Sequence, residues 1–134
     1  MPTFETPEEM ERVLRKMAEL AQSDEALIEA SKGKHLTISY EFPDLDLFFY
    51  TNFLDGKVEA GLGEFEDADV QLTMDSDIFD GMFTGTVNAA KAAMKGDLAF
   101  SGNVAAAMRL QGLMGDFQRI YKQVALRPQA QGEA

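Results

Sequence analysis

The stretch His35-Leu36-Thr37-Ile38-Ser39-Tyr40-Glu41-Phe42 alternates between polar and apolar side chains at every step. A period of two residues is typical of a β-strand with one buried face, because successive side chains point to opposite faces of a sheet. Pro43 follows directly, and proline lacks the backbone N–H that a continuing strand would donate. The stretch therefore predicts a half-buried strand that ends at Phe42.

Three more strands are predicted downstream of this one. The segment 46–54 is apolar on both faces, and Asp55-Gly56 is a two-residue hairpin signal that leads into a return strand at 58–62. After a polar loop at 64–67, apolar and polar residues alternate again over 70–74. Strands joined by a tight turn pair antiparallel, so we expect a largely antiparallel sheet.

A helix is predicted before these strands. Thr6-Pro7-Glu8-Glu9 supplies an N-cap, a proline at the first helical position and a capping-box glutamate, and a one-sided apolar stripe follows over 10–21. Ser23 or Asp24 caps a shorter continuation, which ends by Gly33.

Two short helices, one strand and a long helix are predicted after the first four strands. Asp75 or Ser76 begins the first short helix, and the second spans 87–95. Leu98 and Phe100 mark the fifth strand, and Asn103 caps the longest helix. Helices grouped in this way should cover one face of the sheet, which is an α+β two-layer design.

Length and charge exclude several classes of function. The 134 residues correspond to one domain, and 23 acidic against 12 basic residues give a net charge of −11. That charge opposes binding to a nucleic-acid backbone and electrostatic docking on an anionic bilayer. The chain has no cysteine, one histidine and no apolar run of the length that a membrane helix needs. Disulfides, thiol chemistry and a multi-histidine metal site are therefore excluded.

No motif in the sequence indicates catalysis or a cofactor. His35 is the only histidine, and no G-x-S-x-G elbow accompanies it, so we interpret it as an exposed strand residue. The acidic residues at 64–69 lack the pattern of a calcium loop, and we interpret them as a solvated loop. Asp75 and Asp77 could form an acid–base pair, but they stand where helix caps are expected.

The apolar inventory is the informative part of the composition. Eight methionines and ten phenylalanines are many for a chain of this length, and several fall in the predicted helices after residue 75. Methionine is flexible and polarizable, and therefore suits surfaces that accept apolar ligands of varied shape. The alternative is an ordinary filled core, which composition does not distinguish from a cavity.

An ordered series of motifs covers residues 68–114. The series comprises Ala68-Asp69-Val70-Gln71-Leu72-Thr73-Met74, then Asp77, Phe79, Met82 and Thr84-Gly85, then Lys95-Gly96-Asp97-Leu98-Ala99-Phe100-Ser101-Gly102-Asn103, and finally Ala107-Met108-Arg109-Leu110-Gln111. In this series the chain resembles the sterol carrier protein type-2 family, the nonspecific lipid-transfer domains. The resemblance implies a five-stranded, largely antiparallel sheet with helices on one face and a hydrophobic tunnel between them.

The resemblance also implies a function and a site. Members of that family bind fatty acids, fatty acyl-CoAs, sterols and other lipids without catalysis, and they need no cofactor. The residues that would line the tunnel here are Phe79, Met82, Phe83, Phe100, Met108, Leu113, Met114 and Phe117. Gln111 matches a glutamine that lies near the ligand in relatives, where it could hydrogen-bond a lipid head group; its alternative is an exposed helix residue.

Two features depart from some members of the family. Their N-terminal helix is basic and meets membranes, whereas here the helix carries four glutamates against three basic residues. The chain ends in Gly132-Glu133-Ala134 and not in a peroxisomal targeting tripeptide. We therefore expect a cytoplasmic protein without stable membrane anchoring.

The expected domain organisation is simple. We expect one lipid-binding domain over residues 6–127, an N-terminal tail over 1–5 and a disordered tail over 128–134. The alternative to a lipid carrier is an interaction or dimerisation module with a filled core. In that case Phe48 and Tyr50, on the outer face of the second strand, would form the contact surface.

Overall fold

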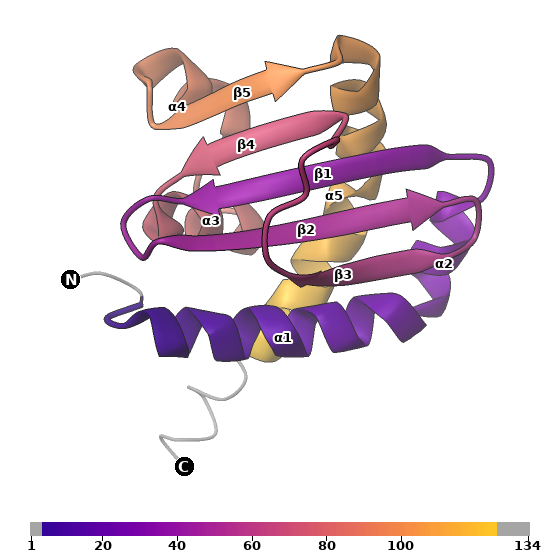
Figure 1. Cartoon of the computed structure of the whole chain (residues 1–134), viewed down its shortest axis with the longest axis horizontal. Coiled ribbons are helices and arrows are strands. Elements are labelled where there is room, and N and C mark those ends of the chain that lie inside the picture. Colours follow the sequence, from indigo (N-terminus) through magenta and orange to yellow (C-terminus); the bar gives the residue numbers. More distant parts are fainter. Residues whose placement is uncertain (1–3, 126–134) are drawn as a thin grey trace.

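The fold is a five-stranded sheet with helices on one face, in a computed structural model that describes residues 4–125 (Figure 1). Its elements in chain order are α1 (Pro7–Ser23), α2 (Glu25–Ser31), β1 (His35–Phe42), β2 (Leu47–Leu54), β3 (Val58–Leu62), β4 (Val70–Met74), α3 (Ser76–Thr84), α4 (Ala89–Lys95), β5 (Leu98–Gly102) and α5 (Val104–Ala125). The expected tail over 128–134 and residues 1–3 of the other tail lie outside the described residues. Phe4 is buried in the core.

The strand order is β3-β2-β1-β4-β5, with β1 in the centre. Three of the four pairings are antiparallel, and β1 pairs with β4 in parallel. The chain reaches β4 by a segment at 63–69, the crossing segment, which runs over the sheet on the face that the helices leave open (Figure 1). The prediction of a largely antiparallel sheet covered on one face is therefore confirmed.

Most of the predicted turns and caps take the expected form. Asp55 and Gly56 have φ angles of 48° and 90°, the left-handed pair that a tight hairpin with the twist of its strands requires. The side chains of Thr6 and Asp24 accept from backbone N–H groups in the first turns of α1 and α2. Asn88, which was not predicted as a cap, does the same for α4, so this helix begins at Ala89 and not at residue 87. The Asn103 side chain accepts from the backbone N–H of Ala106, at the start of α5.

The cap of α3 differs from the prediction. Asp75 occupies the N-cap position, but its side chain makes no capping hydrogen bond. Asp44, from the turn between β1 and β2, instead accepts from the backbone N–H of Ser76 at 3.0 Å and from its hydroxyl at 2.6 Å. A residue distant in sequence thus caps α3, and it ties this helix to the end of the central hairpin.

Asp69 joins the three strands on one side of the sheet. Its carboxylate accepts from the backbone N–H of Thr37 at 2.9 Å, its own N–H donates to the carbonyl of Thr37, and its carbonyl accepts from the N–H of Asn103. Gly102, with φ 123°, lies so close that a Cβ there would collide with the Asp69 carbonyl. Asp69, which the sequence places in a solvated loop, therefore has a structural role.

A bidentate ion pair connects the end of α1 to α5. The Arg119 guanidinium donates to both carboxylate oxygens of Asp24, at 2.9 and 2.7 Å. The Arg119 hydrogen bonds lower the pKa of the Asp24 carboxyl, against the opposing effect of its desolvation. Asp24 also caps α2, so one side chain supports two junctions.

Arg119→Ala should lower the free energy of unfolding by about 1 kcal/mol at neutral pH, since the pair is partly exposed and screened. Because folding lowers the pKa of Asp24, its contribution is present above the ordinary pKa of an aspartate and is lost as the pH falls below it. Urea unfolding of both proteins at neutral and at acidic pH measures this difference. Lys122→Ala is the control, and an equal loss at both pH values would contradict the assignment.

Candidate functional site

The nine residues predicted to contact a ligand fall into two groups in the structure. Five are buried in the core: Phe79, Met82, Phe83, Leu113 and Phe117. Three are exposed on the molecule's surface: Phe100, Met108 and Gln111. Met114 is half-buried between them and packs against the core cluster. The structure therefore brings the five buried residues together as an inner group. It leaves the three exposed residues, the outer group, on a different surface.

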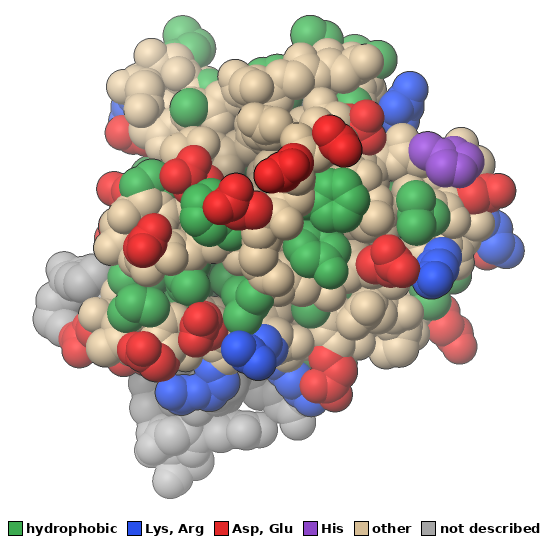
Figure 2. Space-filling model, viewed as in Figure 1, with side chains coloured by type: hydrophobic (Ala, Val, Ile, Leu, Met, Phe, Trp, Pro, Cys, Tyr) green, Lys and Arg blue, Asp and Glu red, His purple; other side chains and the backbone are tan. Residues whose placement is uncertain are grey.

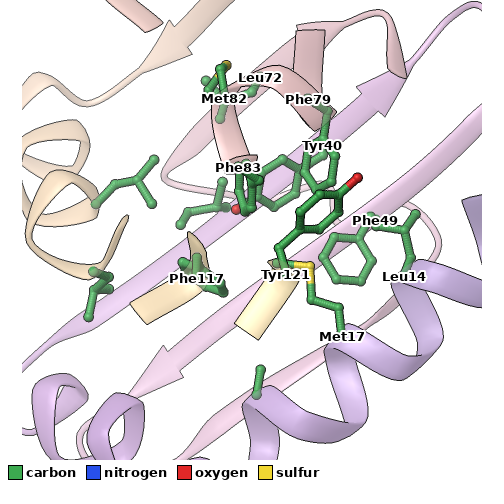
Figure 3. Close-up of a cluster of buried hydrophobic side chains, with 14 of the residues drawn as sticks. Leu14, Met17, Tyr40, Phe49, Leu72, Phe79, Met82, Phe83, Phe117 and Tyr121 are labelled. Atoms are coloured by element: carbon green, nitrogen blue, oxygen red, sulfur yellow. The ribbon is translucent and has the colours of Figure 1, made fainter. Parts of the chain in front are cut away.

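Aromatic rings fill the space between α3, α5 and the sheet (Figure 3). Phe79 and Phe83 lie one turn apart on α3, and their rings stack at 4.3 Å between centroids. Phe83 also meets Phe117 of α5 at 6.1 Å, and Phe117 meets Phe53 of β2 at 5.6 Å. All four side chains are at most 1% exposed. The inner group is therefore a packed wall that joins both helices to the sheet.

Two hydrogen bonds fix α3 to the C-terminal half of α5. The Gln118 side-chain amide donates to the carbonyl of Met82 at 3.0 Å, and the Tyr121 hydroxyl donates to the Asp80 carboxylate at 2.6 Å. Desolvation, together with the Asp80 charge, raises the pKa of Tyr121, so its hydroxyl stays a donor at neutral pH. Both hydrogen bonds come from residues after Gly115, in the second half of α5.

One apolar row crosses the helix-covered face of the sheet, strand by strand. Phe100 pairs with Leu72, Leu72 with Tyr40, and Tyr40 with Phe49. Paired residues of neighbouring strands point to the same face. Their exposed fractions fall along the row from 43% at Phe100 to 5% at Leu72, 2% at Tyr40 and 1% at Phe49. The row is therefore a continuous apolar path from the β5 edge of the sheet into the core.

The first half of α5 exposes an apolar side. Val104 is 69% exposed and Met108, one turn later, is 67% exposed. At about 100° per residue, Met108 lies roughly 150° around the helix axis from Leu110 and Leu113, which face the core. Gln111 is exposed beside Met108. Phe100 and Met108 were predicted in one wall with Phe79, but only Phe100 points to the helix-covered side of the sheet.

The residues considered for catalysis have other surroundings. His35 is exposed at the first position of β1, as expected. Asp75 begins α3. Among the described residues, no three histidine, aspartate or glutamate side chains gather in an arrangement that could hold a metal ion.

The open face of the sheet carries a separate cavity. It has a volume of about 180 Å³ and is lined by Ser39, Tyr40, Glu41, Phe48, Glu64, Phe65, Glu66, Gln71 and Thr73. None of the nine predicted residues borders it. Phe65 of the crossing segment packs on Tyr50 at 5.4 Å between ring centroids, and Phe48 and Tyr50 are half-buried. The crossing segment thus covers part of the surface that the interaction-module alternative requires.

Four apolar residues in the row or near the β5 edge of the sheet were not among the predicted site residues. Leu72 and Tyr40 continue the row from Phe100, and Met94 and Val104 are the two most exposed large apolar residues among those described. The register between β1 and β4 defines the first two, and strand alternation does not reveal that register. The other two stand in helical stretches without acidic neighbours, which is a signal that the sequence does contain.

Because the inner and outer groups differ in burial, substitutions in them should differ strongly in their effect on the free energy of unfolding. Phe79→Ala should lower the free energy of unfolding by about 3–5 kcal/mol, because it leaves a cavity among four packed rings. Met108→Ala should cost less than about 1 kcal/mol, because the side chain is largely exposed. Urea denaturation followed by circular dichroism measures both. Similar losses for the two variants would contradict the division into inner and outer groups.

A family model matches residues 13–115, and its description is the SCP-2 sterol transfer family. No curated protein sequence matches the chain. Solved structures share its fold. Sterol carrier protein 2 from Yarrowia lipolytica, in its apo form, superposes with a TM-score of 0.63 at 24% identity, over 79% of this chain and 89% of that one.

Two other similar structures differ in size and state. The palmitated SCP2L2 of Aedes aegypti has a TM-score of 0.55 at 14% identity, over 78% of this chain and 92% of that one. The stereoselective inverting sec-alkylsulfatase Pisa1 from Pseudomonas sp. has a TM-score of 0.55 at 17% identity, over 69% of this chain. The chain spans only 14% of the length of that enzyme. The same fold therefore occurs both as a small protein and as part of a larger one.

Proposed function

The chain belongs to the SCP-2 sterol transfer family, and we propose that it is a non-catalytic carrier that binds a lipid against the helix-covered face of its sheet. The observation that supports this most is the apolar row from Phe100 to Phe49, which is exposed at one end and fully buried at the other. A lipid tail needs an apolar surface with few polar groups.

The proposed entry lies between β5 and the first half of α5. Phe100 is the exposed end of the row, and two hydrogen bonds to α3 hold the second half of α5. A tail that enters here displaces side chains of the inner group. Met82 belongs to that group and Met114 packs against it, and their unbranched side chains can change shape at low cost.

The proposed ligand is a fatty acid, a fatty acyl-CoA or a sterol-like lipid. Burial of about twelve methylenes contributes roughly 10 kcal/mol before costs, and ordering the chain and the loss of translation offset much of it. Affinity in the micromolar range follows from that balance. The palmitated mosquito relative supports an acyl chain as the ligand.

Gln111 is the proposed polar contact of the head group. It is exposed beside Met108, at the rim of the proposed entry, and its amide both donates and accepts hydrogen bonds. A single neutral amide sets no charge requirement on the ligand. This arrangement supports tolerance of several head groups, with the tail supplying most of the binding free energy.

The proposed place of action is the cytoplasm. The absence of cysteine suits a reducing compartment. Between residues 4 and 125, no helix is both long and apolar enough to span a bilayer. The net charge of −11 gives no support to nucleic-acid binding.

Native mass spectrometry of the purified chain, followed by organic extraction, tests the carrier. We expect extra mass that extracts as a lipid and that returns when palmitate or palmitoyl-CoA is added. A bare mass across fatty acids, acyl-CoAs and sterols would overturn the proposal. A dimer mass that Phe48→Glu abolishes would then favour the interaction module.

Phe100→Glu tests the entry, because this exposed side chain can be changed without disturbing the packed rings. We expect at least a tenfold loss of palmitate binding with unchanged circular dichroism, since a carboxylate at the start of the path would have to be desolvated. Leu54→Glu is the matched control, because Leu54 is 37% exposed at the end of β2, away from the entry. Equal binding by both variants would place the entry elsewhere.

A further inference from the structure

The charge of the chain is distributed unevenly. Residues 81–115 contain only one of the 23 acidic residues, Asp97, and three of the 12 basic ones, Lys91, Lys95 and Arg109. This stretch includes α4, β5 and the first half of α5, which lie together along one edge of the molecule (Figure 1). A strongly acidic protein therefore has one locally basic end.

Helix α4 is largely exposed, although it is rich in apolar residues. Ala92 is its only buried residue, and it faces β5. Met94 is 87% exposed, the highest value among the large apolar residues described, and three alanines of α4 are also exposed. No acidic residue lies within α4. The helix therefore exposes apolar side chains to solvent, Met94 above all.

Both ends of α4 are well fixed despite this small buried area. The Asn88 side chain accepts from the backbone N–H of Lys91 at 3.0 Å, and Gly96, with φ 85°, terminates the helix in the left-handed conformation. The backbone N–H of Gly96 donates to the carbonyl of Ala93, and the N–H of Asp97 donates to the carbonyl of Ala92. The exposed side chains are therefore carried on a defined helix that is anchored to β5.

Lys91, Met94 and Lys95 occupy one side of α4. Their spacing of three and four residues places them within a sector of about 100°, with Met94 roughly opposite Ala92. Neither lysine forms an ion pair with another described residue. Val104 and Met108 add exposed apolar surface on α5, which begins at the opposite end of β5. Figure 2 shows hydrophobic side chains along the upper edge, with acidic side chains spread over the face below it.

We propose that this surface, made of Lys91, Met94 and Lys95 of α4, docks reversibly on an anionic lipid membrane. Exposed apolar side chains flanked by basic ones match the boundary between acyl chains and acidic head groups. The docking role rests on the proposed carrier function, because the surface adjoins the proposed entry at Phe100. Docking there would open the entry directly onto the membrane.

A second copy of the chain fits this surface less well. In a two-fold dimer each patch meets itself, which would bring the two lysines of both copies together. Helix α1 is also a poorer candidate for membrane contact. It carries Glu8, Glu9, Glu11 and Glu19 against three basic residues, and Lys16 is already paired with Glu19 at 3.3 Å.

Sedimentation with vesicles tests the docking of the full chain. We expect adsorption to vesicles of equal parts phosphatidylcholine and phosphatidylglycerol, little adsorption to pure phosphatidylcholine, and loss of adsorption at high salt. Lys91→Gln/Lys95→Gln should weaken partitioning by about fivefold for each lysine removed. Met94→Glu should weaken it further, and its exposed position leaves the fold intact.

Lys16→Gln/Lys57→Gln is the matched control. It removes the same charge from exposed lysines of α1 and of the β2–β3 turn, and it should adsorb as the unaltered chain does. Equal loss in both double variants, adsorption to pure phosphatidylcholine alone, or a stable dimer that Met94→Glu dissolves would each overturn the proposal.

Lipid binding is measured separately on the same variants by native mass spectrometry. The α4 variants should still carry lipid, because their changed side chains lie outside the proposed ligand site. A chain that carries lipid but does not adsorb to anionic vesicles would overturn the docking alone. A chain that adsorbs but carries none would overturn the carrier function and leave the docking surface standing.

Discussion

The rest of the structure depends on the burial of β1 between two partner strands. Leu36, Ile38, Tyr40 and Phe42 are at most 2% exposed, and the strand pairs with β2 on one side and with β4 on the other. The hairpin partner is antiparallel, but the partner on the other side is parallel, so the chain must cross the sheet before β4 begins. Asp69 fixes the start of β4 through hydrogen bonds to the backbone of Thr37 and Asn103. The parallel pairing also leaves β5 as the edge strand, where Phe100 is only partly covered.

Helix α5 links stability to the proposed function because its two halves differ. Its second half is joined to α3 by Gln118 and Tyr121 and to the α1–α2 junction by Arg119. Its first half lies beside the β5 edge and exposes Val104 and Met108. The exposed apolar residues that the proposed carrier function uses therefore lie around the β5 edge, away from the hydrogen bonds that fix the second half of α5.

The sequence predicted the fold far better than the site. Alternation over His35–Phe42, the Asp55-Gly56 turn and the caps at Thr6 and Asn103 are local signals, and the structure confirms them. The family motifs over residues 68–114 added the strand count and the covered face, which the family match now supports. Helical spacing also placed Phe79 and Phe83 on one face of α3. It did not show that Met108 faces away from them, because the orientation of α5 depends on its packing against other helices.

The sequence by itself determined which segments are strands and helices, where they turn and that the chain is strongly acidic. These properties depend on neighbours within a few residues, through backbone conformation, capping and hydrophobic period. Only the tertiary structure decided that Asp44 and not Asp75 caps α3 and that Phe100 leads to Tyr40 and Phe49. Those relations join residues far apart in the chain, and they arise from strand register and helix packing, which minimise exposed apolar area over the whole molecule.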